Sequence, residues 1–246
     1  FHNTIINYTI LNPMSQFVKN ITSIKYFLER SELVDQEYNI NCAYHPKAPE
    51  KSWHSLPTFV AEFNNCSVNS LPLLLTEDRH MLTEHLWPIL DRYKNKPSKN
   101  HKMWDAWGEE IDIRMPPITK QFNGTYKYVW LPIDKYSTGN PWHIWIDVIS
   151  KFRLIEKRWS TNFAKYVYIL ANPSPYFDKV AKELFPDLKY YVMPEGATWR
   201  FQHLIVPSMS NYNDGIITPH MPVWIRHLAN LAKKKHTRQH KKIIIT

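Results

Sequence analysis

Strand and helix patterns alternate from Tyr126 to the end of the chain, and this alternation constrains the fold more than any other feature. Short runs of aromatic and β-branched residues, bounded by Gly or Pro, are typical of strands, and longer amphipathic segments opened by capping residues are typical of helices. The expected strands span residues 126–131, 166–170, 189–193, 201–206 and 242–246, and the expected helices span 142–158, 174–184 and 222–234. This order predicts an α/β fold with a Rossmann-like, mostly parallel sheet and flanking helices on both faces.

Two of the helices have clear start signals. Asn140 followed by Pro141 provides a capping residue and a proline at the first helical position. Ser174 followed by Pro175 repeats the same pattern one strand later. These signals place the start of each helix just after an expected strand, at the edge where open α/β sheets bind ligands.

Residues 1 to about 125 have a different texture. They are rich in Asn, Pro, His and Trp and show few long periodic segments. Helical candidates lie near 15–33 and near 76–93, where Pro88 is expected to kink or end the second helix. We therefore expect an irregular N-terminal region over 1–125, packed on or preceding an acceptor-side lobe over 126–246.

Composition excludes some classes of protein. The chain has 246 residues, with 43% hydrophobic and 22% charged, as in ordinary globular domains. No run approaches the roughly 18 apolar residues that span a bilayer, so no transmembrane segment is predicted. Of the net charge of +9, six positive charges lie within Lys233 to Lys242 without any acid. Because the basicity is one local run, a nucleic-acid partner is not expected.

Cysteines and glycosylation motifs bear on the compartment. Cys42 and Cys66 lack the spacing of a zinc site, so no metal is expected, and they permit one disulfide without requiring it. Four Asn-X-Ser/Thr sequons favour a secretory-pathway lumen (Golgi or endoplasmic reticulum) for a eukaryotic protein. They begin at Asn7, Asn20, Asn65 and Asn123.

The segment Gly139-Asn140-Pro141-Trp142-His143-Ile144-Trp145-Ile146-Asp147-Val148-Ile149-Ser150-Lys151-Phe152 resembles a motif of glycosyltransferase family 61, in which a His-x-Trp-x-Asp-like helix follows a strand. Further segments are similar to the same family in the same order. They are Tyr166 to Leu170, Phe201-Gln202-His203-Leu204-Ile205-Val206-Pro207-Ser208, Trp224-Ile225-Arg226, and Lys241-Lys242-Ile243-Ile244-Ile245-Thr246. The resemblance covers about residues 126–246.

The resemblance implies a fold similar to the two-lobed GT-B glycosyltransferases, with an inverting mechanism and no essential metal or other cofactor. This chain would supply the acceptor-side lobe, and a nucleotide-sugar donor would bind mainly to a lobe expected beyond Thr246. The acceptor would be a glycan or a protein. The sequence itself contains no GxGxxG or other Gly-rich phosphate loop, which agrees with donor binding elsewhere.

His143 and Asp147 are the candidate catalytic residues. Inverting transfer needs a base that takes the proton of the acceptor hydroxyl, and imidazole suits this task. The two residues stand at i and i+4 near the start of a helix, so the carboxylate can orient the imidazole. The alternative is an ordinary helix pair beside a buried face.

Other residues are candidates for substrate contact. Trp142 and Trp145 could stack on an acceptor sugar, or could belong to the core. Glu195 and Arg200, expected in a loop after a strand, could contact acceptor or phosphate, or could be a solvated pair. Asp134 is a further candidate base. The competing hypothesis is a non-catalytic carbohydrate-binding or interaction module with the same fold.

Overall fold

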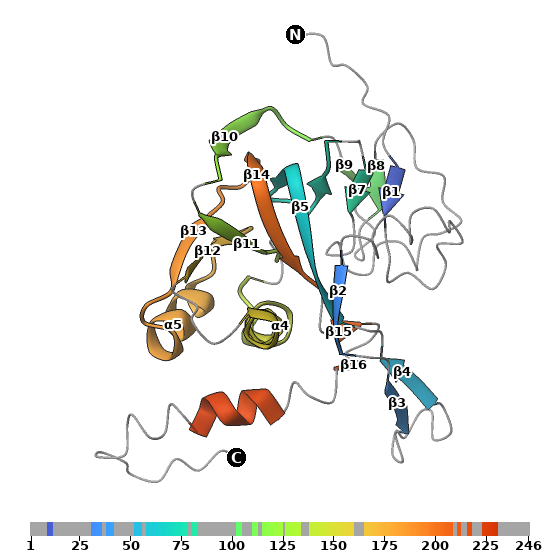
Figure 1. Cartoon of the computed structure of the whole chain (residues 1–246), viewed down its shortest axis with the longest axis vertical. Coiled ribbons are helices and arrows are strands. Elements are labelled where there is room, and N and C mark those ends of the chain that lie inside the picture. The colour runs from blue at the N-terminus through green and yellow to red at the C-terminus, as the bar shows by residue number, and fades with distance from the viewer. Residues whose placement is uncertain are drawn as a thin grey trace.

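The structure is a computed structural model, and it describes a defined part of the chain. The described residues are 9–11, 31–35, 38–41, 52–55, 58–77, 80–82, 102–104, 110–112, 115–124, 126–133, 138–159, 165–208, 211–212, 216–217 and 223–230. Within them, ten strands form one sheet (Figure 1). Its main path runs β1-β7-β6-β5-β14-β11-β12-β13, with β2 on β5 and β10 on β14.

The α/β unit begins at β11 (Lys127–Leu131), and its elements follow the predicted order. It continues through a long helix, β12 (Tyr166–Leu170), α5 (Pro175–Leu184), β13 (Lys189–Val192) and β14 (Thr198–Pro207). β11, β12 and β13 pair in parallel, and β11 also pairs in parallel with β14. The prediction of an α/β chain with a mostly parallel sheet is confirmed for this region.

The helix after β11 is not uniformly α-helical. It begins with α3 (Pro141–His143), continues as the π-helical turn η1 (Ile144–Ile149) and ends as α4 (Ser150–Trp159). The side chain of Asn140 accepts a hydrogen bond from the Trp142 amide and caps the helix, as its sequence position predicts. π turns inside helices are rare in proteins, and those that occur are often found at functional sites.

The N-terminal half contains more regular structure than the sequence indicates. β5 (Thr58–Asn69) is a twelve-residue strand that pairs antiparallel with β14 along the whole of β14. β6 (Leu74–Leu75), β7 (His80–Leu82) and β1 (Thr9–Leu11) extend the sheet beyond β5. The sheet therefore continues across position 125, where we expected a change of domain.

Both helical candidates in this half are wrong where the structure describes them. β2 (Ser31–Asp35) occupies the end of the first candidate, and β7 lies inside the second. β2 and β7 both pair in the main sheet, so strand pairing overrides a helix-like apolar spacing. Thr76 and Glu77, the start of the second candidate, are described and are not helical. The rest of both candidates, the strand expected at 242–246 and residues 222 and 231–234 of the last helix lie outside the described residues.

The remaining strands are short. β10 (Ile118–Phe122) pairs in parallel with the first part of β14. Three two-stranded sheets pair β3 (Tyr38–Asn41) with β4 (Ser52–Ser55), β8 (Lys102–Trp104) with β9 (Glu110–Asp112), and β15 (Asn211–Tyr212) with β16 (Ile216–Ile217). None of the helices in the described ranges is long and apolar enough to cross a membrane.

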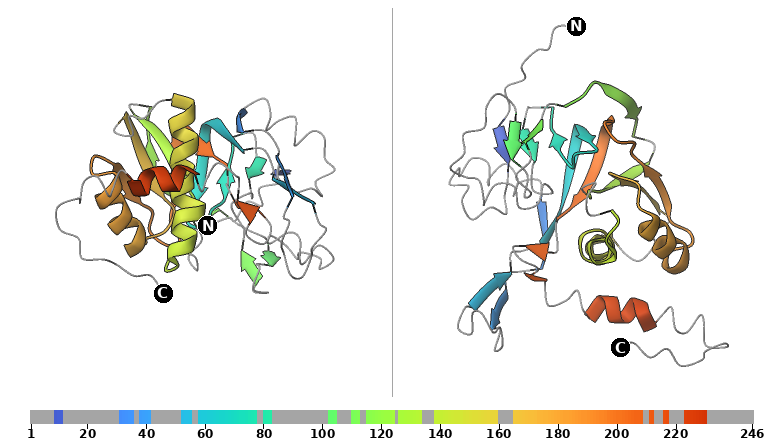
Figure 2. Two further views of the ribbon diagram at one scale, coloured as in Figure 1. Left: turned by 90° about the horizontal axis from the view of Figure 1, so that it is seen from below. Right: turned by 180° about the vertical axis from the view of Figure 1, so that it is seen from behind.

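Two clusters of buried residues lie on opposite faces of the sheet, and the helices contribute to one of them. Ile144, Phe152, Phe177 and Trp224 all pack in the cluster that contains Leu131 and Tyr168. The other cluster contains residues of strands and of the loop before β14, and no described helix. Figures 1 and 2 show α4, α5 and the helix over 223–230 (red) grouped on one side. The expectation of helices on both faces is wrong for the described part of the chain.

β5 and β14 both change the phase of their buried–exposed alternation at the same point, while the same core cluster contains Phe63 and Cys66 of β5 and Phe201 and Leu204 of β14. Asn64 and Asn65 are consecutive exposed residues in β5, and Gln202 and His203 opposite them are likewise outside the core. Asn65 has a φ of 50°, which Asn tolerates better than most residues. Because both strands change phase together, each strand has two consecutive residues outside the core at this point, and their polar side chains lie on the surface.

Candidate functional site

The candidate site is built around His143, in the first turn of the helix after β11. Its Nδ1 lies 2.7 Å from Oδ2 of Asp147. The side chains are 25% and 15% exposed, respectively, so the pair is accessible at its histidine end. With Nδ1–H as donor to the carboxylate, the neutral imidazole carries its lone pair on Nε2, which is the arrangement of a base with an orienting acid.

Asp147 has an unusual environment. Its Oδ1 is buried and makes no hydrogen bond among the described residues. The Lys151 ammonium, itself buried, donates to the backbone carbonyl of Asp147. A buried unsatisfied carboxylate oxygen costs stability, and such groups are concentrated at functional sites and places where a further ligand binds.

The loops that carry the site are tied to one another at the carboxyl edge of the parallel strands. Asn172, which follows β12, donates from Nδ2 to the carbonyl oxygens of Ser70 (2.8 Å) and Ile133 (2.6 Å). The Ser70 hydroxyl accepts a hydrogen bond from the Gly196 amide in the turn after β13. Asn172 therefore joins the ends of β5, β11 and β12, and Ser70 adds the end of β13.

A second tie holds the loop in front of His143. Ser174 caps α5 by accepting from the Phe177 amide, and its hydroxyl donates to the Thr138 carbonyl at 2.7 Å. Thr138 lies two residues before Asn140, the cap of the His143 helix. The two helix starts are thus fixed relative to each other, and this pre-organises the site.

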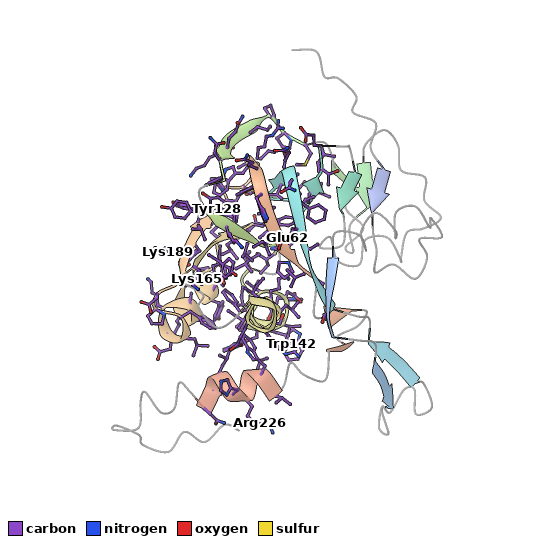
Figure 3. All side chains as sticks on the ribbon, viewed as in Figure 1. Glu62, Tyr128, Trp142, Lys165, Lys189 and Arg226 are labelled. Carbon is purple, nitrogen blue, oxygen red and sulfur yellow. The ribbon has the colours of Figure 1, made fainter. Side chains whose placement is uncertain are left out.

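The two tryptophans differ in position. Trp142 is 52% exposed at the start of the helix (Figure 3), so it is not a core residue. Trp145 is partly buried and packs against the helix-side core. Trp142 is next to His143 in the chain and presents an aromatic surface to solvent, whereas Trp145 is mainly structural.

Glu195 and Arg200 do not form a pair in one loop. Glu195 is exposed in the turn after β13, as expected, but Arg200 lies within β14, opposite Ser67 of β5. The predicted strand began at residue 201, whereas β14 begins at Thr198, which explains this error. Arg200 is 42% exposed, and its Nη2 lies 3.7 Å from Oε1 of Glu77. Asp134 lies outside the described residues.

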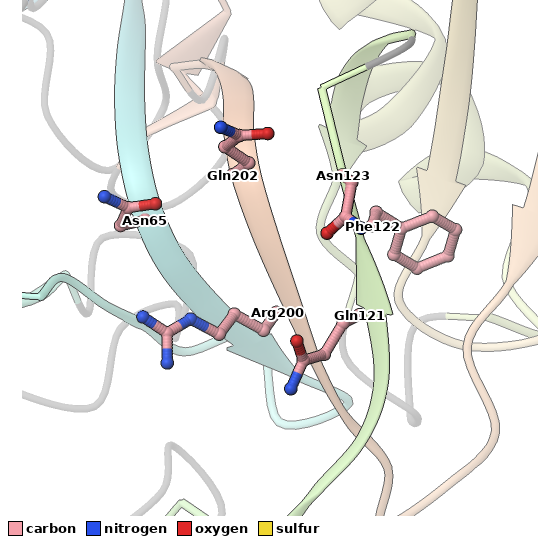
Figure 4. Close-up of a pocket in the computed structure, with 6 residues that line it drawn as sticks. All are labelled: Asn65, Gln121, Phe122, Asn123, Arg200 and Gln202. Atoms are coloured by element: carbon pink, nitrogen blue, oxygen red, sulfur yellow. The ribbon is translucent and has the colours of Figure 1, made fainter.

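Arg200 lines a shallow groove of about 480 Å³ on the polar surface of the β5–β14 ribbon. The other lining residues are Asn65, Gln121, Phe122, Asn123 and Gln202 (Figure 4). They come from β5, β14 and the end of β10, so the groove lies where the alternation of the two ribbon strands changes phase. Sequence reasoning missed it because the groove depends on a pairing between segments that are far apart in the chain.

Tyr190 and Cys66 have raised pKa values. Burial raises the pKa of Tyr190 to about 12, with a further contribution from its hydrogen bond to Asp178. Burial raises the pKa of the Cys66 thiol well above its ordinary value, because the residue is fully buried in the sheet. Cys66 is a free thiol, and Cys42 lies outside the described residues. Neither Tyr190 nor Cys66 is at the His143 site.

No family model matches the chain, and neither a curated protein nor a solved structure is similar to it at a significant level. The resemblance to glycosyltransferase family 61 therefore rests on the motifs of the sequence. Among the described residues, no group of three or more His, Cys, Asp or Glu could hold a metal ion.

Proposed function

We propose that this chain is the acceptor-side lobe of an inverting, metal-independent glycosyltransferase that transfers a sugar from a nucleotide-sugar donor to a glycan or protein acceptor. The observation that carries the proposal is the His143–Asp147 hydrogen bond, 2.7 Å long, in the first turns of a helix after a parallel strand. The donor would be held by a second, GT-B-like lobe that follows this one.

In the proposed reaction, His143 Nε2 takes the proton of the acceptor hydroxyl as the oxygen attacks the anomeric carbon. The new C–O bond forms on the face opposite the leaving nucleoside diphosphate, so the configuration inverts. Asp147 holds the ring orientation and stabilises the imidazolium that forms. The Lys151 ammonium donates to the backbone carbonyl of Asp147, so this part of the helix is held beside the His143 ring.

The acceptor would approach past Trp142. Its exposed indole lies one residue before His143 and can cover an apolar sugar face, while the sugar hydroxyls remain in reach of polar groups. Glu195, exposed in the turn after β13, stands at the same edge of the sheet and is a second acceptor contact. Trp145 supports this surface from the core side.

The test measures turnover in the full-length protein with a panel of radiolabelled nucleotide sugars and glycan acceptors. His143→Ala is expected to lower kcat by roughly two to four powers of ten, the usual contribution of a general base. Asp147→Asn is expected to lower kcat by less, because the carboxylate only orients the ring. Donor affinity is expected to change little in both variants.

His203 provides a matched control. Its Nε2 lies 3.0 Å from Oε2 of Glu62, so it is also a partly exposed His–carboxylate pair, but it lies on the β5–β14 ribbon. His203→Ala is expected to keep wild-type turnover. If folded His143→Ala transfers sugar at close to the wild-type rate, or if both alanine variants lose activity equally, His143 is not the base.

A non-catalytic carbohydrate-binding module is the second candidate, and exposed aromatic side chains favour it. Tyr126, Trp142 and Tyr191 are all exposed, and the Lys120 ammonium lies 4.8 Å from the ring centroid of Tyr191. Such a module would bind glycans with no transfer from any nucleotide sugar, and binding would be unaffected by His143→Ala.

A further inference from the structure

Two of the four glycosylation sequons meet in one groove. Asn65 lies in β5 and Asn123 follows β10, 58 residues later in the chain. Both line the same groove as Arg200 (Figure 4). Both side chains are exposed. Asn7 and Asn20, which begin the other two sequons, lie outside the described residues.

The two sequons differ in local structure. Asn123 lies in the turn between β10 and β11, and its side chain makes no hydrogen bond within the described part of the chain. The Asn65 amide nitrogen donates to Oε2 of Glu77 at 3.0 Å, and Asn65 is held in the middle of a paired strand next to the buried Cys66. An accessible amide in a surface turn is the usual setting of an N-linked glycan.

Gly124 fixes the geometry of the Asn123 turn. Its amide donates to Oε1 of Gln202 at 2.8 Å. A Cβ at this position would lie 3.0 Å from the same oxygen, which is closer than side chains normally approach. The turn is therefore bound closely to β14, and the exposed Asn123 beside it lines the groove.

We infer that Asn123 carries an N-linked glycan, that Asn65 does not, and that this glycan covers the groove around Arg200. In the transfer, the Asn123 amide nitrogen forms a bond to the anomeric carbon of a lipid-diphosphate-linked oligosaccharide. The bond between that carbon and the diphosphate oxygen breaks, the amide loses one proton, and the lipid diphosphate leaves. A glycan on Asn65 would occupy the same groove as a glycan on Asn123. We therefore expect the groove to hold one glycan.

The covering has a consequence for the acceptor. A bulky, hydrated glycan over Arg200, Gln121 and Gln202 makes this face of the β5–β14 ribbon unavailable to partners. His143 is not among the residues that line this groove, so the proposed acceptor site is a separate surface. The inference depends on passage through the secretory pathway and not on the proposed transfer chemistry.

Site occupancy is measured on the full-length protein purified from eukaryotic cells that express it. The glycans are removed enzymatically in ¹⁸O-labelled water, and the peptides that contain Asn65 and Asn123 are analysed by mass spectrometry. The expected result is conversion of Asn123 to labelled Asp in most molecules, no conversion at Asn65, and loss of the signal in Thr125→Ala. An unmodified Asn123, or occupancy at Asn65 equal to that at Asn123, overturns the inference.

Covering of the groove is measured separately by phenylglyoxal labelling of arginines. Labelling of Arg200 is expected to rise several-fold in Thr125→Ala, while labelling of the exposed Arg226, on the helix over 223–230, stays constant. Equal labelling of Arg200 with and without the glycan shows that the groove is not covered. A protein glycosylated at Asn123 but inactive as a transferase contradicts the proposed function alone.

Discussion

Asn172 is the residue whose replacement tests most directly how the carboxyl edge of the sheet is held. It is 2% exposed, and its Nδ2 donates to two backbone carbonyls from different parts of the chain, Ser70 and Ile133. Asn172→Ala would leave both carbonyls buried without this donor, at a cost of about 1–3 kcal/mol for each, or about 2–6 kcal/mol in total. That is a large part of the roughly 5–15 kcal/mol by which a domain is stable.

Asn172→Asp is the sharper form of the test because it keeps the shape of the side chain. It places a carboxylate oxygen against two carbonyl oxygens, so a repulsion is added to the lost hydrogen bonds. Unfolding in urea, followed by far-UV circular dichroism, is expected to give the order wild type, Asn172→Ala, Asn172→Asp in falling stability. Asn64→Asp, at an exposed position, is the control and is expected to change stability by no more than about 0.5 kcal/mol. If Asn172→Asp is as stable as wild type, Asn172 does not join these loops.

Three further predictions concern the core and its titrating groups. Phe152→Ala is expected to lower the unfolding free energy by about 3–5 kcal/mol in urea titrations, because Phe152 is fully buried between the rings of Phe185 (4.9 Å) and Tyr168 (4.8 Å); a loss below 1 kcal/mol would contradict this packing. The pKa of Tyr190 is raised from 10.0 to about 12, so its contribution to stability is present below pH 10 and is lost as pH rises towards 12. In thermal melts over that pH interval, Tyr190→Phe is expected to lose less stability than the wild type. Cys66 is expected to react with Ellman's reagent only after unfolding, because it is buried and burial raises its thiol pKa; rapid reaction in the native state would show that β5 opens.

Local signals in the second half of the chain predicted β11, β12, α5 and β13, but not β15 or β16. The strand at 166–170 was predicted with the bounds of β12, since Tyr166-Val167-Tyr168-Ile169-Leu170 is apolar throughout and is buried throughout. The caps at Asn140 and Ser174 act as expected, because a side-chain cap depends on residues two or three positions away. The contact between His143 and Asp147 was predicted for the same reason, because the two residues are four positions apart on one helix.

The remainder depends on contacts between distant segments. β5 was not predicted because Asn64 and Asn65 interrupt its apolar alternation, and the reason for the interruption is the phase change shared with β14. Arg200 was assigned to a loop since Pro194 and Gly196 suggest a longer turn, yet pairing with Ser67 extends the strand back to Thr198. The π turn at Ile144–Ile149 has no composition signal that distinguishes it from an α-helix.

The pairing of β5 with β14 also determines how late in translation the sheet can form. Glu62 and His203, which meet across the two strands, are 141 positions apart. At about 5–20 residues per second, the centre of β5 leaves the ribosome roughly 7–28 s before its partner in β14 does. During that interval the apolar side of β5, with Phe63, Cys66 and Val68, has to be shielded by other contacts or by a chaperone. Slower translation between residues 70 and 200 would therefore be expected to increase aggregation of the nascent chain, and folding of the whole sheet can be completed only after residue 207 has emerged.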